Sequence, residues 1–271
     1  MADKQQAIGI FDSGYGGLTV LKEIVKTLPQ YDYIYLGDNA RAPYGSRSFE
    51  TVYEYTLQCV KALFDKGCHL VILACNTASA KALRTIQQKD LPLIDANRRV
   101  LGVIRPTTEI IGNYTKSGKV GVLGTAGTVS SGSYLVEIEK FFPQLNVYQE
   151  ACPMWVPLIE NNEIDTPGAD FFIKRHVESL LAKEKNIDAV ILGCTHYPLV
   201  KKTILDIVGE DVLLIDTGDA IAKRVVALSQ DLQNHNKNDL NIEILYTGKI
   251  NSDMVKIILG KNKFEMRKCE L

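Results

Sequence analysis

Two stretches far apart in the chain share one order of residue types. Residues 71–78 read Val-Ile-Leu-Ala-Cys-Asn-Thr-Ala, and residues 190–198 read Val-Ile-Leu-Gly-Cys-Thr-His-Tyr-Pro. An apolar run rich in β-branched residues is typical of a strand buried on both faces, and the hydroxyl and amide groups that follow often cap helices. We therefore expect Cys75 and Cys194 each to lie at the carboxyl end of a parallel strand, the edge of an α/β sheet where ligands bind.

Strand and helix patterns alternate along the rest of the chain. We expect strands at residues 7–11, 31–36, 69–74, 91–94, 119–123, 145–149, 188–192, 212–215 and 242–246. The expected helices include one that Ser48 can cap and others at about 105–114, 130–140 and 168–182. This alternation indicates an α/β fold with mainly parallel sheets and helices on both faces.

The repetition extends beyond the two cysteines. A strand, the loop Asp-Ser-Gly-Tyr-Gly-Gly at 12–17 and a helix precede Cys75, just as a strand, the loop Gly-Thr-Ala-Gly-Thr at 124–128 and a helix precede Cys194. Internal similarity of this kind indicates two related halves. We expect two similar α/β domains related by pseudo-two-fold symmetry, residues 1–97 plus 210–271 and residues 98–209, with the active site in the cleft between them.

Composition and charge narrow the function classes. The 271 residues are 46% hydrophobic and 23% charged, with a formal net charge of −1, as in an ordinary globular protein. No basic stripe or acidic block indicates nucleic acid or a membrane surface as a partner, and no apolar run is long enough to cross a bilayer. The first six residues lack the apolar core of a signal peptide, so we expect a cytoplasmic protein.

The six cysteines do not form a metal-binding pattern. Cys-x-x-Cys pairs and His/Cys clusters with zinc-site spacing are missing from the sequence, so we expect no metal. In a cytoplasmic chain the thiols should stay reduced. We interpret Cys59, Cys68 and Cys269 as packing or surface residues.

Two thiols on matching turns suit one kind of chemistry if the halves face each other. A thiolate on one side of a cleft can remove a proton from carbon while a thiol opposite donates one, which inverts a stereocentre. A free thiol has a pKa near ~8.5, so the thiolate needs stabilisation by a helix N-terminus or an acid–base partner. Candidate partners are Asp12 for Cys75 and His196 for Cys194, and Glu160 is a candidate to orient His196.

Short polar side chains at the loop–helix junctions favour an anionic ligand. Ser13, Asn76, Thr77, Thr125 and Thr195 can join exposed backbone N–H groups in holding carboxylates, and Asp12 can hold an ammonium group. Each residue also has a purely structural interpretation: a buried cysteine is more often packing than catalysis, and Glu160 is by default a helix-surface acid. The glycine-rich loop matches neither the dinucleotide nor the P-loop fingerprint.

Four segments, in this order, resemble the signatures of glutamate racemases. They are Ile10–Leu18, Pro43–Gly45, Ala74–Ala78 and Gly193–Pro198. The resemblance implies a cofactor-independent enzyme that interconverts L- and D-glutamate and supplies D-glutamate for peptidoglycan in a bacterial cytoplasm. It also implies a homodimer.

The resemblance also assigns roles to residues. Cys75 would act on D-glutamate and Cys194 on L-glutamate, with Asp12, His196 and Glu160 assisting. Substrate contacts would come from these residues: Asp12, Ser13, Pro43, Tyr44, Gly45, Asn76, Thr77, Thr125, Thr195 and His196. Alternatives that the residues leave open are a racemase for aspartate or another small acid, a binding protein without activity, and a cysteine-dependent hydrolase.

Overall fold

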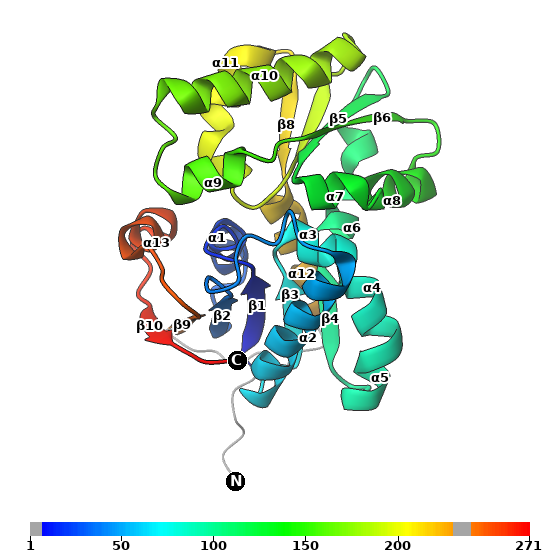
Figure 1. Ribbon diagram of the computed structural model, residues 1–271. Coiled ribbons are helices and arrows are strands. Elements are labelled where there is room, and N and C mark those ends of the chain that lie inside the picture. The colour runs from blue at the N-terminus through cyan, green and yellow to red at the C-terminus, as the bar shows by residue number, and fades with distance from the viewer. Residues whose placement is uncertain (1–6, 230–239) are drawn as a thin grey trace.

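Two parallel sheets organise the structure, one above the other in Figure 1. The computed structural model describes residues 7–229 and 240–271. In these residues the first sheet has six strands in the order β10-β9-β2-β1-β3-β4, and the second has four in the order β6-β5-β7-β8. Their bounds are β1 Ile8–Asp12, β2 Tyr33–Gly37, β3 Leu70–Leu73, β4 Arg99–Gly102, β5 Lys119–Gly124, β6 Asn146–Ala151, β7 Ala189–Gly193, β8 Leu213–Asp216, β9 Ile242–Tyr246 and β10 Glu265–Lys268.

The two sheets share a repeated topology. The order β2-β1-β3-β4 in the first sheet is the same as β6-β5-β7-β8 in the second, and every described pairing is parallel. Cys75 follows β3 and Cys194 follows β7, so the cysteines occupy equivalent strand ends. The predicted α/β class with two parallel sheets is confirmed.

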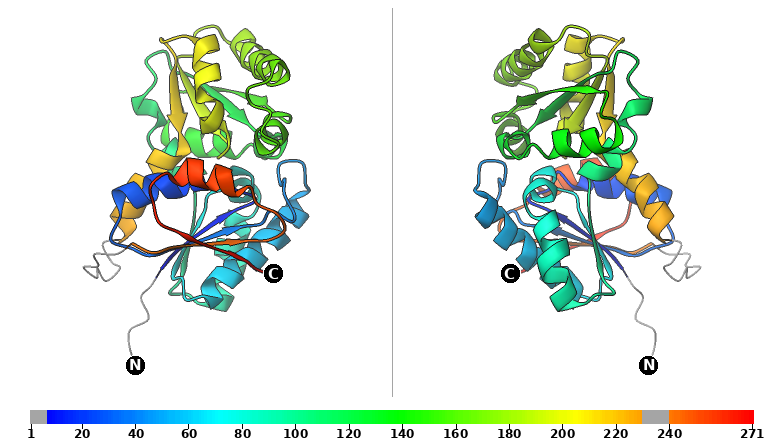
Figure 2. Two further views of the ribbon diagram at one scale, coloured as in Figure 1. Left: turned by 90° about the vertical axis from the view of Figure 1, so that its left-hand side faces the viewer. Right: turned by 90° about the vertical axis from the view of Figure 1, so that its right-hand side faces the viewer.

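Helices cover both faces of each sheet (Figures 1 and 2). The core of the first lobe contains α1, α12 and α13 on one face and α2 and α3 on the other; in the second lobe α9, α10 and α11 oppose α6 and α8. The helix bounds are α1 Leu18–Thr27, α2 Phe49–Asp65, α3 Asn76–Lys81, α4 Leu83–Thr85, η1 Ile86–Asp90, α5 Leu91–Ile94, α6 Ile104–Thr108, η2 Ile111–Asn113, α7 Ala126–Ser130, α8 Ser133–Phe141, α9 Trp155–Glu160, α10 Pro167–Lys183, η3 Tyr197–Val200, α11 Lys201–Val208, α12 Thr217–Ser229 and α13 Ser252–Leu259.

The apolar runs form strands because both faces of each sheet are buried. In β3, Leu70 and Ile72 pack in one core while Val71 and Leu73 pack in the other. Side chains alternate between the faces of a strand, so a strand covered by helices on both sides needs an uninterrupted apolar run. Ser48 caps α2 as predicted, since its Oγ accepts a hydrogen bond of 3.1 Å from the Thr51 N–H.

One predicted strand is wrong. Residues Leu91–Ile94 form helix α5, and the strand at this place in the sheet is β4, which the sequence did not predict. Pro92 stands in the first turn of the helix, where its missing N–H costs nothing. The side chain of Leu93 is 87% exposed, so its apolar character did not mark a buried strand.

Two predicted helices are shorter than expected. The one expected at 130–140 is interrupted at Gly132, where a φ of +63° ends α7 and precedes α8. The one expected at 105–114 ends at Thr108 and is followed by the 3₁₀ turn η2. Strand β10 near the C-terminus was not predicted.

The chain passes between the lobes at α6 and returns along α12 (Figure 1). The expected second domain was residues 98–209, yet β4 pairs with β3 in the first sheet and β8 pairs with β7 in the second. Strand β4 was expected in the second domain but belongs to the first sheet, and β8 was expected in the first domain but belongs to the second sheet. Each repeat includes a fourth strand, which moves both crossing points a few residues toward the C-terminus. The overall division stays a prediction. After α12, β9 and β10 extend the first sheet beside β2.

In residues 7–229 and 240–271, none of the helices has both the length and the apolar character that a bilayer crossing requires. Within the same ranges, no group of three or more His, Cys, Asp or Glu side chains is arranged to hold a metal ion.

Candidate active site

Cys75 is the N-cap residue of α3. Its Sγ accepts a hydrogen bond from the Ala78 N–H and donates one to Ser13 Oγ, both at 3.5 Å. Burial, and after it the charge of Asp12, raises the pKa of the Cys75 thiol to about 12, although the bonds to Ser13 and Ala78 work in the opposite direction. Cys75 is therefore a thiol at neutral pH.

Cys194 lies beside an imidazole. Its Sγ is 3.8 Å from His196 Nδ1, and His196 Nε2 is 3.0 Å from Glu160 Oε1. Burial lowers the pKa of His196, but the hydrogen bonds and charges of Cys194 and Glu160 outweigh it and raise that pKa to about 10. His196 is therefore protonated at neutral pH, and this positive charge lies beside the Cys194 sulfur.

The glycine-rich loop after β1 makes room for this imidazole. A Cβ atom on Gly16 would lie 2.5 Å from His196 Cε1, and one on Gly14 would lie 2.8 Å from Glu160 Oε1. The Tyr15 ring packs edge-on against His196, and its hydroxyl donates a 3.0 Å hydrogen bond to the Ile159 carbonyl. The loop therefore serves as a packing surface that holds His196 and Glu160 across the lobe boundary.

Asp12 lies behind the site, fully buried at the end of β1. Its carboxylate accepts hydrogen bonds from the Gly14 N–H at 3.0 Å and from Thr195 Oγ1 at 3.3 Å. Burial raises the pKa of Asp12, whereas the charge of His196 lowers it. Asp12 was predicted to assist Cys75, but its hydrogen bond to another side chain goes to the turn that carries Cys194.

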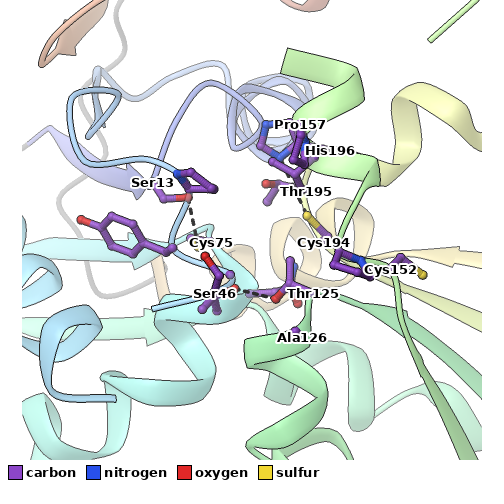
Figure 3. A pocket seen from close by; sticks show the side chains of 17 residues that line it. Ser13, Ser46, Cys75, Thr125, Ala126, Cys152, Pro157, Cys194, Thr195 and His196 are labelled. Atoms are coloured by element: carbon purple, nitrogen blue, oxygen red, sulfur yellow. Dashed lines mark hydrogen bonds between the residues drawn. The ribbon is translucent and has the colours of Figure 1, made fainter. Parts of the chain in front are cut away.

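A cavity of about 130 Å³ separates the two cysteines. Figure 3 shows Cys75 and Ser13 on one side of it and Cys194, Thr195 and His196 on the other. One water needs only about 10–15 Å³, so the cavity has room for a small polar molecule. The lining residues are Ser13, Pro43, Tyr44, Gly45, Ser46, Cys75, Asn76, Thr77, Thr125, Ala126, Cys152, Pro153, Val156, Pro157, Cys194, Thr195 and His196.

Polar groups from both lobes meet in the cavity wall. Thr77 Oγ1 of the first lobe lies 2.9 Å from Thr125 Oγ1 of the second. The Asn76 side chain is buried, and its Nδ2 has no hydrogen-bond partner among the described residues. A buried N–H donor without a partner is costly, so this amide is suited to an acceptor oxygen on a ligand.

The loop at Pro43–Gly45 is held from both sides. The Tyr44 hydroxyl donates a 2.5 Å hydrogen bond to the buried carboxylate of Asp38, which also accepts one from Thr247 after β9. The Gly45 carbonyl accepts a 2.7 Å hydrogen bond from the Gly127 N–H of the second lobe. The C-terminal segment therefore helps to fix this wall of the cavity.

The structure brings together most of the predicted site residues. Asp12 and Glu160 do not line the cavity; they lie behind Thr195 and His196 and contact them. Six lining residues were not predicted: Ser46, Ala126, Cys152, Pro153, Val156 and Pro157. Cys152 follows β6, the neighbour of β5, so the rule that ligands bind at the carboxyl edge of parallel strands could have indicated it.

The chain is similar to known proteins in both its sequence and its fold. A profile described as Asp/Glu/hydantoin racemase matches residues 8–225. The glutamate racemase of Geobacter metallireducens is 46% identical over 223 residues, which cover 82% of this chain and 79% of that protein.

Two solved structures with a similar fold are glutamate racemases as well. Glutamate racemase isoform RacE1 from Bacillus anthracis has a TM-score of 0.90 at 33% identity, covering 99% of this chain and 98% of that one. The glutamate racemase of Francisella tularensis in complex with D-glutamate has a TM-score of 0.86 at 32% identity, with 98% of each chain covered.

Proposed function

The chain belongs to the Asp/Glu/hydantoin racemase family, and we propose that it is an isomerase that interconverts L- and D-glutamate by proton transfer between Cys75 and Cys194. The observation that carries this proposal is the position of the two thiols. They follow equivalent strands, β3 and β7, and both line one cavity. A racemase needs an acid–base group on each face of the substrate carbon, and this arrangement provides two of the same kind.

The reaction is balanced by the two sulfur atoms alone. With L-glutamate bound, the Cys194 thiolate takes the proton from Cα, and the electron pair is delocalised into the adjacent carboxylate. The Cys75 thiol then donates its proton to the opposite face, which gives D-glutamate, a Cys75 thiolate and a Cys194 thiol. The reverse reaction uses the same groups with their protonation states exchanged, so the proposal needs no cofactor.

The protonation states favour Cys194 as the first base. His196, with its pKa near 10, stabilises a thiolate at 3.8 Å, whereas Cys75, with its pKa near 12, carries the proton to be donated. Glu160 holds the imidazole in position through its 3.0 Å hydrogen bond. A side chain that transfers a proton in the transition state, as each of the two cysteines does in this proposal, contributes roughly 10²–10⁴-fold to the rate.

Glutamate suits the polar groups of the cavity. Asn76 offers an unused amide N–H, and Ser13, Thr77 and Thr125 add hydroxyls to the cavity wall that can hold carboxylates. Pro43, Tyr44 and Gly45 also line the cavity. The curated relatives and the solved structures described above are glutamate racemases, one of them in complex with D-glutamate.

We place this activity in the supply of D-glutamate for peptidoglycan in a bacterial cytoplasm, carried out by a homodimer. Restored growth of a bacterium that depends on added D-glutamate would test the physiological role. Sedimentation of the purified protein would test the assembly, and a monomer at micromolar concentration would contradict it.

The activity is tested by incubation with L-glutamate and L-aspartate separately in D₂O. Circular dichroism should show complete loss of signal with L-glutamate only, and mass spectrometry should find deuterium at Cα of both enantiomers. Loss of signal with aspartate alone would assign the protein to the other substrate. A product without solvent deuterium would exclude proton exchange.

A further inference from the structure

Tyr134 of α8 lies behind the cavity and contacts both cysteine turns. Its hydroxyl donates a 2.7 Å hydrogen bond to Asn76 Oδ1, next to Cys75. Its ring packs against Gly193, next to Cys194, where a Cβ atom would lie 3.2 Å from Tyr134 Cε2. The residue is fully buried and does not line the cavity.

The hydrogen bond fixes which end of the Asn76 amide faces the cavity. Because Oδ1 accepts the Tyr134 proton, the opposite group, Nδ2, is left without a partner among the described residues. Asn76 is buried and lines the cavity. An asparagine without this restraint can rotate and present either an acceptor or a donor, and an acceptor would repel a carboxylate.

The two ends of this hydrogen bond come from different lobes. Asn76 begins α3 in the first lobe, and Tyr134 stands near the start of α8 in the second. The bond therefore joins the two lobes directly behind the cavity. Burial raises the pKa of Tyr134 far above its usual value, so the hydroxyl keeps its proton and remains a donor.

The geometry points to Tyr134 as a positioning residue for substrate binding: from the second lobe it orients the Asn76 amide of the first so that the amide N–H group meets a substrate carboxylate. This inference rests on the proposed function and adds a residue that does not itself touch the substrate.

The test is a double-mutant cycle with Tyr134→Phe and Asn76→Ala. Tyr134→Phe removes only the hydroxyl and should raise KM for both enantiomers, and the Kd of D-glutamate, by roughly tenfold, with kcat within about twofold. A raised KM with an unchanged kcat is expected when the lost interaction is made equally with the bound substrate and with the transition state. In the Asn76→Ala background the same change should have no further effect on KM, because the amide to be oriented is gone.

The matched control is Tyr33→Phe. Tyr33 is equally buried in β2, and its hydroxyl donates a 2.6 Å hydrogen bond to the Leu28 carbonyl away from the cavity. Thermal unfolding should shift similarly in both tyrosine variants, whereas KM should change only in Tyr134→Phe. Equal KM changes in the two variants, or additive effects with Asn76→Ala, would overturn the inference.

The Kd of D-glutamate, measured by isothermal titration calorimetry, separates this inference from the proposed function. A protein that binds D-glutamate without racemising it would refute the reaction while the Kd values still decide the role of Tyr134. A protein that binds neither enantiomer would overturn both.

Discussion

The Cys75 turn and the Cys194 turn occupy equivalent places in two sheets of the same strand order, yet different groups surround the two sulfur atoms. Cys194 has His196 at 3.8 Å and, through it, Glu160. Cys75 has the Ser13 hydroxyl and the Ala78 N–H, both at 3.5 Å. The repeat therefore sets where the sulfur atoms lie, and the positions at which the two halves differ in residue type set the groups around each sulfur.

This difference means that symmetry of position does not give symmetry of protonation. At neutral pH His196 is protonated beside Cys194, while burial and the charge of Asp12 keep the proton on Cys75. In the proposed mechanism the resting protein is ready for L-glutamate, and the Cys75 thiolate exists only after a turnover. Five substitutions would break or sharpen this comparison.

Removing either sulfur should have the largest effect. Cys75→Ser and Cys194→Ser should each lower kcat by roughly 10³-fold or more, because a serine hydroxyl is a far weaker acid than a thiol. Circular dichroism with each enantiomer measures the loss. Cys269→Ser, at a partly exposed thiol that does not line the cavity, is the matched control. Full racemisation by either cavity variant would contradict the two-thiol mechanism.

Removing the imidazole should affect the two directions unequally. His196→Asn should lower kcat/KM by about 10²-fold, since Cys194 loses the cation that stabilises its thiolate. Enantiomers have an equilibrium constant of one, so kcat/KM must fall equally in both directions. The asymmetry should appear in kcat, with the larger loss from L- to D-glutamate. Equal losses of kcat would show that the two turns are equivalent after all.

Neutralising Glu160 should have a smaller effect and move the pH profile. Glu160 raises the pKa of His196, so Glu160→Gln should lower that pKa and let His196 lose its proton at a lower pH. Activity should fall about tenfold, and the alkaline limb should move down from near pH 10. The substrate amine titrates identically in both assays and does not contribute to the difference. An alkaline limb at the same pH in the variant and the unmodified protein would show that Glu160 does not raise the pKa of His196.

The smallest effect is expected on the other side of the cavity. Ser13→Ala removes a hydrogen bond that lowers the pKa of Cys75, so the Cys75 thiolate costs more free energy to form. We expect a two- to fivefold loss of kcat, roughly what one weak hydrogen bond contributes, and mainly from D- to L-glutamate. Ser117→Ala, in an exposed turn of the second lobe, serves as the control. A loss that is larger from L- to D-glutamate would reverse the assignment of the two thiols.

The limits of sequence-based prediction are visible at particular elements. The run before Cys75 predicted β3 because two buried faces need continuous apolar residues. The run at Leu91–Ile94 has similar residues but forms a helix, with Leu93 in solvent. Short apolar runs fit either structure, and only their surroundings distinguish the two.

The sequence by itself determined the features that depend on neighbouring residues: the buried strands, the capped helices, and the two cysteines at matching strand ends. The tertiary structure decided the contacts between distant segments, such as Asp12 with Thr195 and Tyr134 with Asn76. Residue periodicity records burial and backbone preference within one element. It carries no information about how two lobes meet, and the charges beside each thiol depend on that meeting.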